Sequence, residues 1–318
     1  MRIAVSGANG FVGSWICRIL AVSNEVYALV RQKSDISRLG GIHGLNICRL
    51  NESDFNSFVL EKRLDAVILC DWWGVENYYK DDARQFENVK RYRNRISSLR
   101  EIRNVVALGS QAELGPQKVQ ITEECSGTPS TAYGRAKSDV REFLQTNLDA
   151  EVHFIWGRVF SSYGPLDSNS WFIPSTILKL LNMQKVQLTK GIQEWSFLHA
   201  YDLGCAIETM VQNNSVSGIV NIGNPNTVRI IDVAKFIESN IGRRGLLEFG
   251  AIPYNTNQVM KLAPVTKKLN EAGWTPMINI EDGLSHLINW MSGKHNTNLV
   301  TKDRRHLSFD LPSYLSMK

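Results

Sequence analysis

The chain has 318 residues, of which 43% are hydrophobic and 21% charged, and this globular composition excludes a largely disordered or fibrous protein. Its 36 basic and 31 acidic residues give a net charge of +5 that is spread along the chain. One cluster of arginines, in residues 91–103, is interleaved with other side chains, which favours a solvated helix face over a nucleic-acid footprint. We therefore expect no nucleic-acid partner.

The start of the chain and its cysteines indicate a cytoplasmic protein. Met1 leads at once into an apolar strand pattern and a glycine-rich turn, so we expect no signal peptide. No apolar stretch approaches the roughly 18–20 residues of a membrane-spanning helix, so no membrane partner is expected. The five cysteines are scattered and never form a C-x-x-C pair, which is typical of reduced thiols. The six histidines lack H-x-x-H spacing, and we expect no metal site.

Short, apolar, β-branched runs alternate with longer helical stretches through the first half of the chain. The runs expected as strands are Ile3–Val5, Val26–Val30, Asn46–Leu50, Ala66–Cys70, Val105–Leu108 and Val152–Ile155. Runs of this kind are typical of parallel strands covered by helices on both faces. Right-handed crossovers then give an α/β fold, a doubly wound parallel sheet of the Rossmann type, whose ligand crevice lies at the carboxyl ends of the strands.

The pattern changes after Tyr163-Gly164-Pro165, where segments rich in Asn, Ser and Pro separate short helices. A smaller C-terminal substrate lobe over the crevice explains this change. We expect a Rossmann domain over 1–165 with a returning segment near 192–222, and a lobe over 166–191 and 223–292. The tail, 293–318, is polar and lacks periodicity, so it is expected to be partly disordered or an interaction arm.

A glycine-rich turn joins the first strand to the first helix. Gly7, Gly10 and Gly13 are spaced three apart, where backbone N–H groups and the helix dipole converge on a dianion. Gly7 would permit a tight turn, Gly10 would let a diphosphate approach, and Gly13 would let the helix pack on the strand. The turn predicts a dinucleotide site, and a generic tight turn is the other interpretation. Its further members are Asn9, Phe11 and Val12.

The end of the second strand indicates which dinucleotide binds. An acidic side chain there would accept hydrogen bonds from both ribose hydroxyls and select NAD. The chain has Arg31 instead, followed by Lys33, Ser34 and Arg38. Because a guanidinium suits a 2′-phosphate, we predict NADP(H), with NAD as the second candidate. An exposed basic loop is the other interpretation.

Three polar side chains form a candidate catalytic constellation. Tyr133 and Lys137 are four residues apart, hence on one helical face, and Ser110 follows the strand that precedes them. We expect Lys137 to lower the pKa of the phenol and to bind the nicotinamide ribose. Tyr133 would then pass a proton to a carbonyl oxygen as hydride reaches the carbon, and Ser110 would donate a second hydrogen bond to that oxygen.

These motifs together resemble the extended short-chain dehydrogenase/reductases, also called NAD-dependent epimerases/dehydratases, from Met1 to about Met291. The resemblance includes the glycine turn, the trio, the Tyr-Gly-Pro segment ending at Pro165, Phe197–Asp202 and Leu269–Trp274. It implies a homodimer and a set of further cofactor-binding residues. These are Asn51 and Glu52 near the adenine, Leu69, Cys70 and Asp71 after the fourth strand, Asn88 on the following helix, and Val159.

The resemblance also points to one branch of the family. Its sugar-nucleotide dehydratases carry Thr-Asp-Glu where this chain has Ser110-Gln111-Ala112, so dehydration is not expected. The sequence resembles the 4-ketoreductases of deoxysugar biosynthesis, and we expect an NADPH-dependent reductase of a nucleotide-linked 4-keto-6-deoxyhexose. A 4-epimerase that uses NAD and a non-catalytic dinucleotide sensor are the alternatives. The residues expected at the sugar are Trp72, Gln111, Ser161, Trp171, Phe172 and Trp195, with core packing as the second interpretation of Trp171 and Phe172.

Two further positions bear on the substrate site. Family members often carry Arg where this chain has Asn255, so we expect either that another cation holds the substrate diphosphate or that the substrate differs from the family norm. The candidates are Lys179, Lys185 and Arg229. His199 is interpreted as a structural histidine at a strand end, because Tyr133 already fills the catalytic role.

Overall fold

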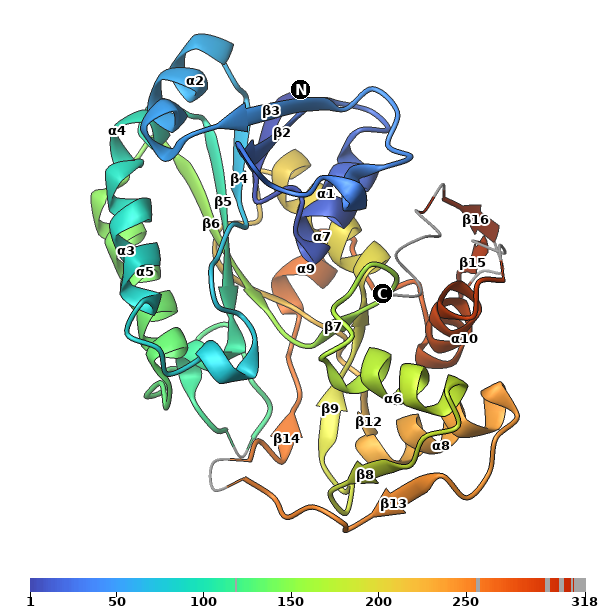
Figure 1. Ribbon diagram of the computed structural model, residues 1–318. Helices are drawn as coiled ribbons and strands as arrows, with labels where there is room; N and C mark the ends of the chain where they lie inside the picture. The colour runs from blue at the N-terminus through green and yellow to red at the C-terminus, as the bar shows by residue number, and fades with distance from the viewer. Residues whose placement is uncertain (118, 256–257, 295–297, 303–305, 310, 312–318) are drawn as a thin grey trace.

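Seven parallel strands form the central sheet, in the order β11-β6-β5-β4-β1-β2-β3. We describe them from a computed structural model, which covers residues 1–311 except 118, 256–257, 295–297, 303–305 and 310 (Figure 1). The strands are β1 (Arg2–Ser6), β2 (Glu25–Arg31), β3 (Asn46–Leu50), β4 (Ala66–Leu69), β5 (Asn104–Ser110), β6 (His153–Val159) and β11 (Gly218–Ile222). The strand order reverses between β1 and β4, which places the crevice of a doubly wound sheet at their carboxyl ends and confirms the predicted fold class.

The predicted strands are all present, and the largest differences in length are at β5 and β6, which are seven residues long where four were predicted. β3 has the predicted bounds, whereas β6 continues from Ile155 to Val159. The predicted strand stops at Ile155, but β6 stays buried through Arg158, because the neighbours β5 and β11 pair with it along this stretch. A buried arginine breaks the apolar pattern, so the sequence predicted too short a strand.

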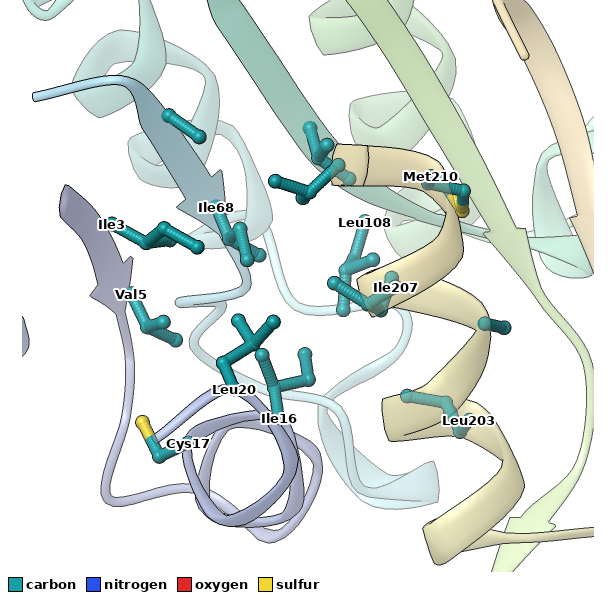
Figure 2. Packing of buried hydrophobic residues seen from close by; sticks show 14 of the residues in the cluster. Ile3, Val5, Ile16, Cys17, Leu20, Ile68, Leu108, Leu203, Ile207 and Met210 are labelled. Atoms are coloured by element: carbon teal, nitrogen blue, oxygen red, sulfur yellow. The ribbon is translucent and has the colours of Figure 1, made fainter. Parts of the chain in front are cut away.

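Alternate residues of each strand point to opposite faces, and different helices cover the two faces. The helices are α1 (Phe11–Leu20) and α7 (Ala200–Gln212) on one face, and α2 (Phe55–Lys62), α3 (Gln85–Asn94), α4 (Ile96–Leu99) and α5 (Ala132–Asn147) on the other. Figure 2 shows Leu20 of α1 near Ile68 of β4, and Ile207 of α7 near Leu108 of β5. Gly204 allows this close packing, since a Cβ there would lie 2.6 Å from Cγ1 of Ile19.

A smaller lobe is built from short strands and three helices (Figure 1), which enclose a second apolar cluster. Its elements are α6 (Phe172–Leu181), β8 (Val186–Leu188), β9 (Glu194–Ser196), β12 (Thr227–Arg229), α8 (Ile230–Ile241), β13 (Leu247–Phe249), β14 (Lys261–Leu262) and α10 (Ile280–Met291). Strand β8 pairs with β13, and β9 lies between β12 and β14. The returning segment supplies α7 and β11 to the sheet domain, whereas β9 belongs to the lobe sheet.

Short elements complete the chain between these units. They are the 3₁₀ turns η1 (Ser37–Leu39), η2 (Glu52–Asp54), η3 (Asn77–Tyr79) and η4 (Gln111–Leu114), the paired strands β7 (Ser162–Tyr163) and β10 (Leu198–His199), and helix α9 (Lys267–Glu271). The chain first crosses into the lobe at Pro165 and Leu166. There the Trp15 indole N–H donates to the Pro165 carbonyl at 2.9 Å, and Nε of Arg38 donates to the Leu166 carbonyl at 2.8 Å.

The tail packs in part against the rest of the molecule. Strands β15 (Asn298–Val300) and β16 (His306–Ser308) form an antiparallel hairpin beside α10. Leu299 is buried, and the Phe309 ring meets the Trp15 ring edge-on at 5.4 Å. Single apolar side chains therefore anchor these residues of the tail without a periodic pattern, whereas a partly disordered tail or an interaction arm stays a prediction. Residues 312–318 lie outside the described part of the chain.

Among the described residues, no helix has the length and hydrophobicity needed to cross a membrane.

Candidate active site

The glycine turn has the geometry of an anion site. Gly7 has φ +68°, and a Cβ there would lie 2.7 Å from Cα of Asp71. A Cβ on Gly13 would lie 2.3 Å from the Gly7 carbonyl oxygen, so helix and turn are in direct contact. Helix α1 starts after Gly10 with no acidic residue in its first turn and no side-chain cap from the described residues. The helix N-terminus therefore presents backbone N–H groups, and the turn fits a dinucleotide diphosphate.

Neighbouring side chains fix this turn in place. The Asn9 side chain donates to the Asp35 carbonyl at 3.1 Å, which joins the turn to the loop after β2. Phe11 packs against the apolar cluster of the lobe, and Val12 packs against the core between α1 and the sheet. The turn is thus held from both the sheet domain and the lobe.

A basic surface lies at the end of β2. Arg31 is exposed at the last position of this strand, and its carbonyl accepts the Ser34 N–H at 3.0 Å. Nη1 of Arg49, on the adjacent strand β3, donates to the carbonyls of Gln32 at 2.7 Å and Ser34 at 3.1 Å. Arg49 thus holds the loop that follows Arg31. The sequence analysis missed this role, although Arg49 was expected on a strand that neighbours Arg31.

A partly buried ion-pair network joins the strand ends next to the turn. The Arg95 guanidinium contacts Asp71 at 2.8 and 2.9 Å and Glu52 at 2.6 and 2.7 Å, and the Ser6 hydroxyl donates to Asp71 at 2.5 Å. Although burial alone would raise it, the pKa of Asp71 is lowered by Arg95. Arg95 is 4% exposed, so the interpretation of the arginine cluster as a solvated helix face is wrong for this residue. Its charge is buried because two carboxylates neutralise it.

The other predicted cofactor residues lie at the same edge of the sheet, where they make contacts that stabilise the structure. Asn88 accepts the Trp73 N–H at 3.0 Å and donates to the Trp73 carbonyl at 3.1 Å, so it holds the loop after β4. The Cys70 thiol donates to a carbonyl of β1, and burial raises its pKa. Leu69 is buried in the core, and Asn51 forms a capping box at η2.

The structure brings the three candidate catalytic side chains together. Ser110 ends β5, where it is opposite Val159 of β6; its hydroxyl accepts the Ala112 N–H at 3.2 Å and lies close enough to the phenol of Tyr133 to lower the pKa of that group. Helix α5 begins one residue before Tyr133, whose N–H donates to the Lys80 carbonyl at 2.7 Å. Nζ of Lys137 donates to the Leu108 carbonyl at 2.7 Å. Tyr133 is 9% exposed and Lys137 is 4% exposed, so the site is largely closed to water.

Burial dominates the ionisation of this pair. It raises the pKa of Tyr133 to about 12, against a smaller lowering by the Ser110 hydroxyl. It lowers the pKa of Lys137 to about 7, against smaller effects of the Glu113 and Asp71 carboxylates. The expectation that Lys137 lowers the pKa of the phenol is therefore wrong for the protein without bound ligands. The phenol stays protonated at neutral pH and is suited to donate a proton.

Glu113, a buried carboxylate that the sequence analysis missed, stabilises the segment that begins at Ser110. Glu113 accepts Nε of Arg158 at 2.5 Å and the indole N–H of Trp156 at 2.9 Å. The fit is close, because a Cβ on Gly109 would lie 2.2 Å from that indole nitrogen. This arrangement fixes the end of β5. Its sequence signal, a Glu and an Arg that are both flanked by apolar residues, lies in two distant segments.

The aromatic residues expected at the sugar differ in their surroundings. The Trp72 ring lies against Tyr133 and Lys137. Trp171 precedes α6, and Nζ of Lys80 lies 5.7 Å from its ring centroid. Phe172 packs in the lobe, as does Trp195, whose indole N–H donates to the Val259 carbonyl at 2.7 Å.

The polar candidates are likewise placed at different points. Gln111 opens η4 directly after Ser110 and is half-buried, and the Ser161 carbonyl accepts the Leu198 N–H at 2.9 Å. Of the cations expected to hold a diphosphate, Lys185 is paired with Glu248 at 2.5 Å and Arg229 with Asp232 at 2.7 Å. Lys179 lies in the last turn of α6, and Asn255 is exposed.

His199 has a structural role, as predicted. Its Nδ1 accepts the Tyr201 N–H at 3.1 Å and thereby caps α7. Its ring is buried against Trp15 and Tyr163, and burial lowers its pKa far below the usual value.

Comparisons with known proteins agree with the fold and with the geometry of the site. The sequence model of the NAD dependent epimerase/dehydratase family matches residues 3–223. The chain is 30% identical over 315 residues to GDP-L-fucose synthase 1 of Arabidopsis thaliana, which covers 91% of this chain and 92% of that protein. It is 28% identical over 145 residues to CDP-abequose synthase of Salmonella typhimurium, which covers 43% of this chain and 48% of that protein. The fold is similar to the solved structure of UDP-N-acetylglucosamine 4-epimerase from Methanobrevibacter ruminantium M1 in complex with UDP-N-acetylmuramic acid. The TM-score is 0.83 at 17% identity, over 92% of this chain and 98% of that chain.

Proposed function

The chain belongs to the NAD dependent epimerase/dehydratase family, and within it we propose an NADPH-dependent reductase of a nucleotide-linked 4-keto-6-deoxyhexose. One observation carries this proposal. Ser110 and Tyr133 meet at the carboxyl end of β5, while the two positions after Ser110 hold Gln111 and Ala112. Neither side chain can act as the acid or base that elimination of water requires, so the site supports reduction of a carbonyl rather than dehydration.

The chain's own residues supply the proton in this reaction. The reduced nicotinamide, when bound, supplies a hydride to the carbonyl carbon. Tyr133 donates a proton to the carbonyl oxygen, since its raised pKa keeps the phenol protonated at neutral pH. Ser110, whose hydroxyl lies beside the phenol, donates a second hydrogen bond to the same oxygen. Lys137 places a cation beside the phenol when protonated and stabilises the phenolate left after the transfer.

Two features support NADPH as the cofactor. The turn at Gly7, Gly10 and Gly13 would hold the diphosphate with backbone N–H groups. Arg31 would pair with the 2′-phosphate, on a loop that Arg49 keeps in position.

The test is an absorbance assay. The protein is mixed with NADPH and with a 4-keto-6-deoxyhexose linked to CDP, dTDP, GDP or UDP. The oxidation of NADPH is followed by the loss of absorbance at 340 nm, and one NADPH is consumed for each product molecule. We expect turnover with one of them, and absence of turnover with all four contradicts the proposal. Arg31→Ala should raise the Kd for NADPH about 10–100-fold and leave that for NADH within about 2-fold. Arg243→Ala, an exposed arginine of the lobe, is the matched control.

A 4-epimerase that uses bound NAD is the second candidate. The similarity of this chain's fold to that of a UDP-N-acetylglucosamine 4-epimerase favours this candidate, since an epimerase can use the same trio. Purified protein that carries stoichiometric NAD and interconverts sugar nucleotides without net consumption of cofactor would support this candidate. The homodimer stays a prediction, which light scattering would test. A cytoplasmic location also stays a prediction.

A further inference from the structure

We propose that Trp72 is a positioning residue, which holds the Lys137 ammonium on the face of its indole ring beside Tyr133. The proposal rests on the function proposed above, since it concerns how the candidate catalytic lysine is held. The sequence analysis placed Trp72 at the sugar, whereas its contacts in the structure are with the catalytic pair.

The indole contacts both members of the pair. Nζ of Lys137 lies 3.7 Å from the centroid of the Trp72 ring, well inside the roughly 6 Å over which a cation is attracted to an aromatic face. The Tyr133 ring meets the same indole edge-on, with centroids 5.9 Å apart and an interplanar angle of 85°. With the hydrogen bond to the Leu108 carbonyl on another side, the ammonium is confined between the strand end and the ring.

The indole itself is fixed by a buried anchor. Its N–H donates to Oε1 of Gln85 at 2.8 Å, and Gln85 is fully buried. Nε2 of Gln85 donates to the carbonyls of Gly74 at 2.6 Å and Tyr79 at 3.0 Å. Gly74 permits this approach, because a Cβ there would lie 2.7 Å from that nitrogen. The ring is therefore held at one orientation rather than packed loosely in the crevice.

The other charged groups near Lys137 already have partners of their own. The titratable groups that act on it are Glu113 of η4, Asp71 and Cys70 after β4, and Tyr133 on its own helix. Glu113 is paired with Arg158 and Asp71 with Arg95. The Cys70 thiol and the phenol are neutral at neutral pH, because burial raises the pKa of both. The aromatic face and the Leu108 carbonyl are thus the direct contacts that favour the charged lysine, and the aromatic face is the one that a side-chain substitution can remove.

This role predicts a shift in the titration of Lys137. A cation–π contact of this kind changes an ionisation midpoint by about 0.4–1.5 pH units, so its removal should make the lysine lose its proton at lower pH. Phenylalanine keeps an aromatic face and should restore most of the midpoint, whereas leucine and methionine should not.

The experiment follows the ζ-nitrogen resonance of Lys137 by NMR in ¹⁵N-lysine-labelled protein from about pH 4.5 to 10, a range that covers midpoints on both sides of the wild-type pKa of about 7, with Lys137→Met to assign it. We expect the midpoint to fall by about one pH unit in Trp72→Leu and to stay near that of the wild type in Trp72→Phe. Trp73→Phe is the matched control, because the neighbouring ring stacks on Tyr79 and Arg84 instead. Trp72→Met replaces the leucine variant if circular dichroism shows that the latter is unfolded.

The possible outcomes separate this inference from the proposed function. Equal midpoints in wild type and in the folded non-aromatic variant would overturn the role of Trp72, as would a fall in Trp72→Phe as large as in that variant. The measurement needs neither cofactor nor sugar. A protein that fails to oxidise NADPH with any 4-keto sugar, yet shows the expected midpoints, would refute the proposed reaction and leave the role of Trp72 supported.

Discussion

Lys137→Met should stabilise the protein at low pH and destabilise it at high pH. In the folded protein the pKa of Lys137 is lowered from 10.5 to about 7, mainly by burial. Below pH 7 the buried ammonium therefore costs about 4–5 kcal/mol of folding free energy. Methionine removes this cost but also the donor to the Leu108 carbonyl, about 1–2 kcal/mol, and the cation on the Trp72 face, about 1 kcal/mol. We expect a net stabilisation of about 2 kcal/mol at pH 6.

The dependence on pH has a definite sign. The folded-state pKa lies below that of the unfolded chain, so the penalty in the wild type is complete below pH 7 and disappears as the pH rises through 10.5. At pH 10.5 the variant lacks only favourable contacts and should be less stable by about 1 kcal/mol. Urea unfolding of both proteins between pH 6 and 10.5 measures the difference, with exposed Lys33→Met as control. A difference that does not change with pH would refute the reasoning.

Three further substitutions test the site. Tyr133→Phe should lower kcat about 10²–10⁴-fold in the reductase assay and leave the Kd for NADPH within about 2-fold, and a variant with the kcat of the wild type would contradict the role as general acid. Glu113→Gln leaves the buried Arg158 charge without its carboxylate, so urea denaturation should show a loss of about 3–5 kcal/mol. Unchanged stability would mean that the ion pair is not structural. Gly13→Ala places a methyl group 2.3 Å from the Gly7 carbonyl oxygen and should weaken NADPH binding at least about 10-fold, as measured by fluorescence titration. Wild-type affinity would show that the turn can open at no cost.

Local rules were enough for the glycine turn and the trio. The positive φ of Gly7 and the close contact at Gly13 could be predicted from the sequence, because glycine is the residue that tolerates both. Ser110 and Tyr133 could be brought together because parallel strands end at one edge of the sheet. In each case the chemistry depends on a spacing or a strand end.

Long-range pairing could not be predicted in this way. Arg95 is buried by Asp71 and Glu52, which are 24 and 43 residues away, so its helix pattern alone indicated a solvated face. The ionisation of Lys137 and Tyr133 likewise depends on how deeply they are buried, which no spacing reveals. The contact between Trp72 and Lys137 also required the three-dimensional arrangement of β4 and α5.

The first crossing from the sheet domain into the lobe, at Pro165 and Leu166, limits how the lobe can move relative to the sheet. Trp15 of α1 and Arg38 of η1 grip the carbonyls of Pro165 and Leu166, and bending there would break two hydrogen bonds of about 1 kcal/mol each. Because α1 begins at the glycine turn, the phosphate end of the crevice and the entry to the lobe move as one rigid piece. A movement of the lobe relative to the sheet would then pivot on the later crossings of the chain and leave the glycine turn in place.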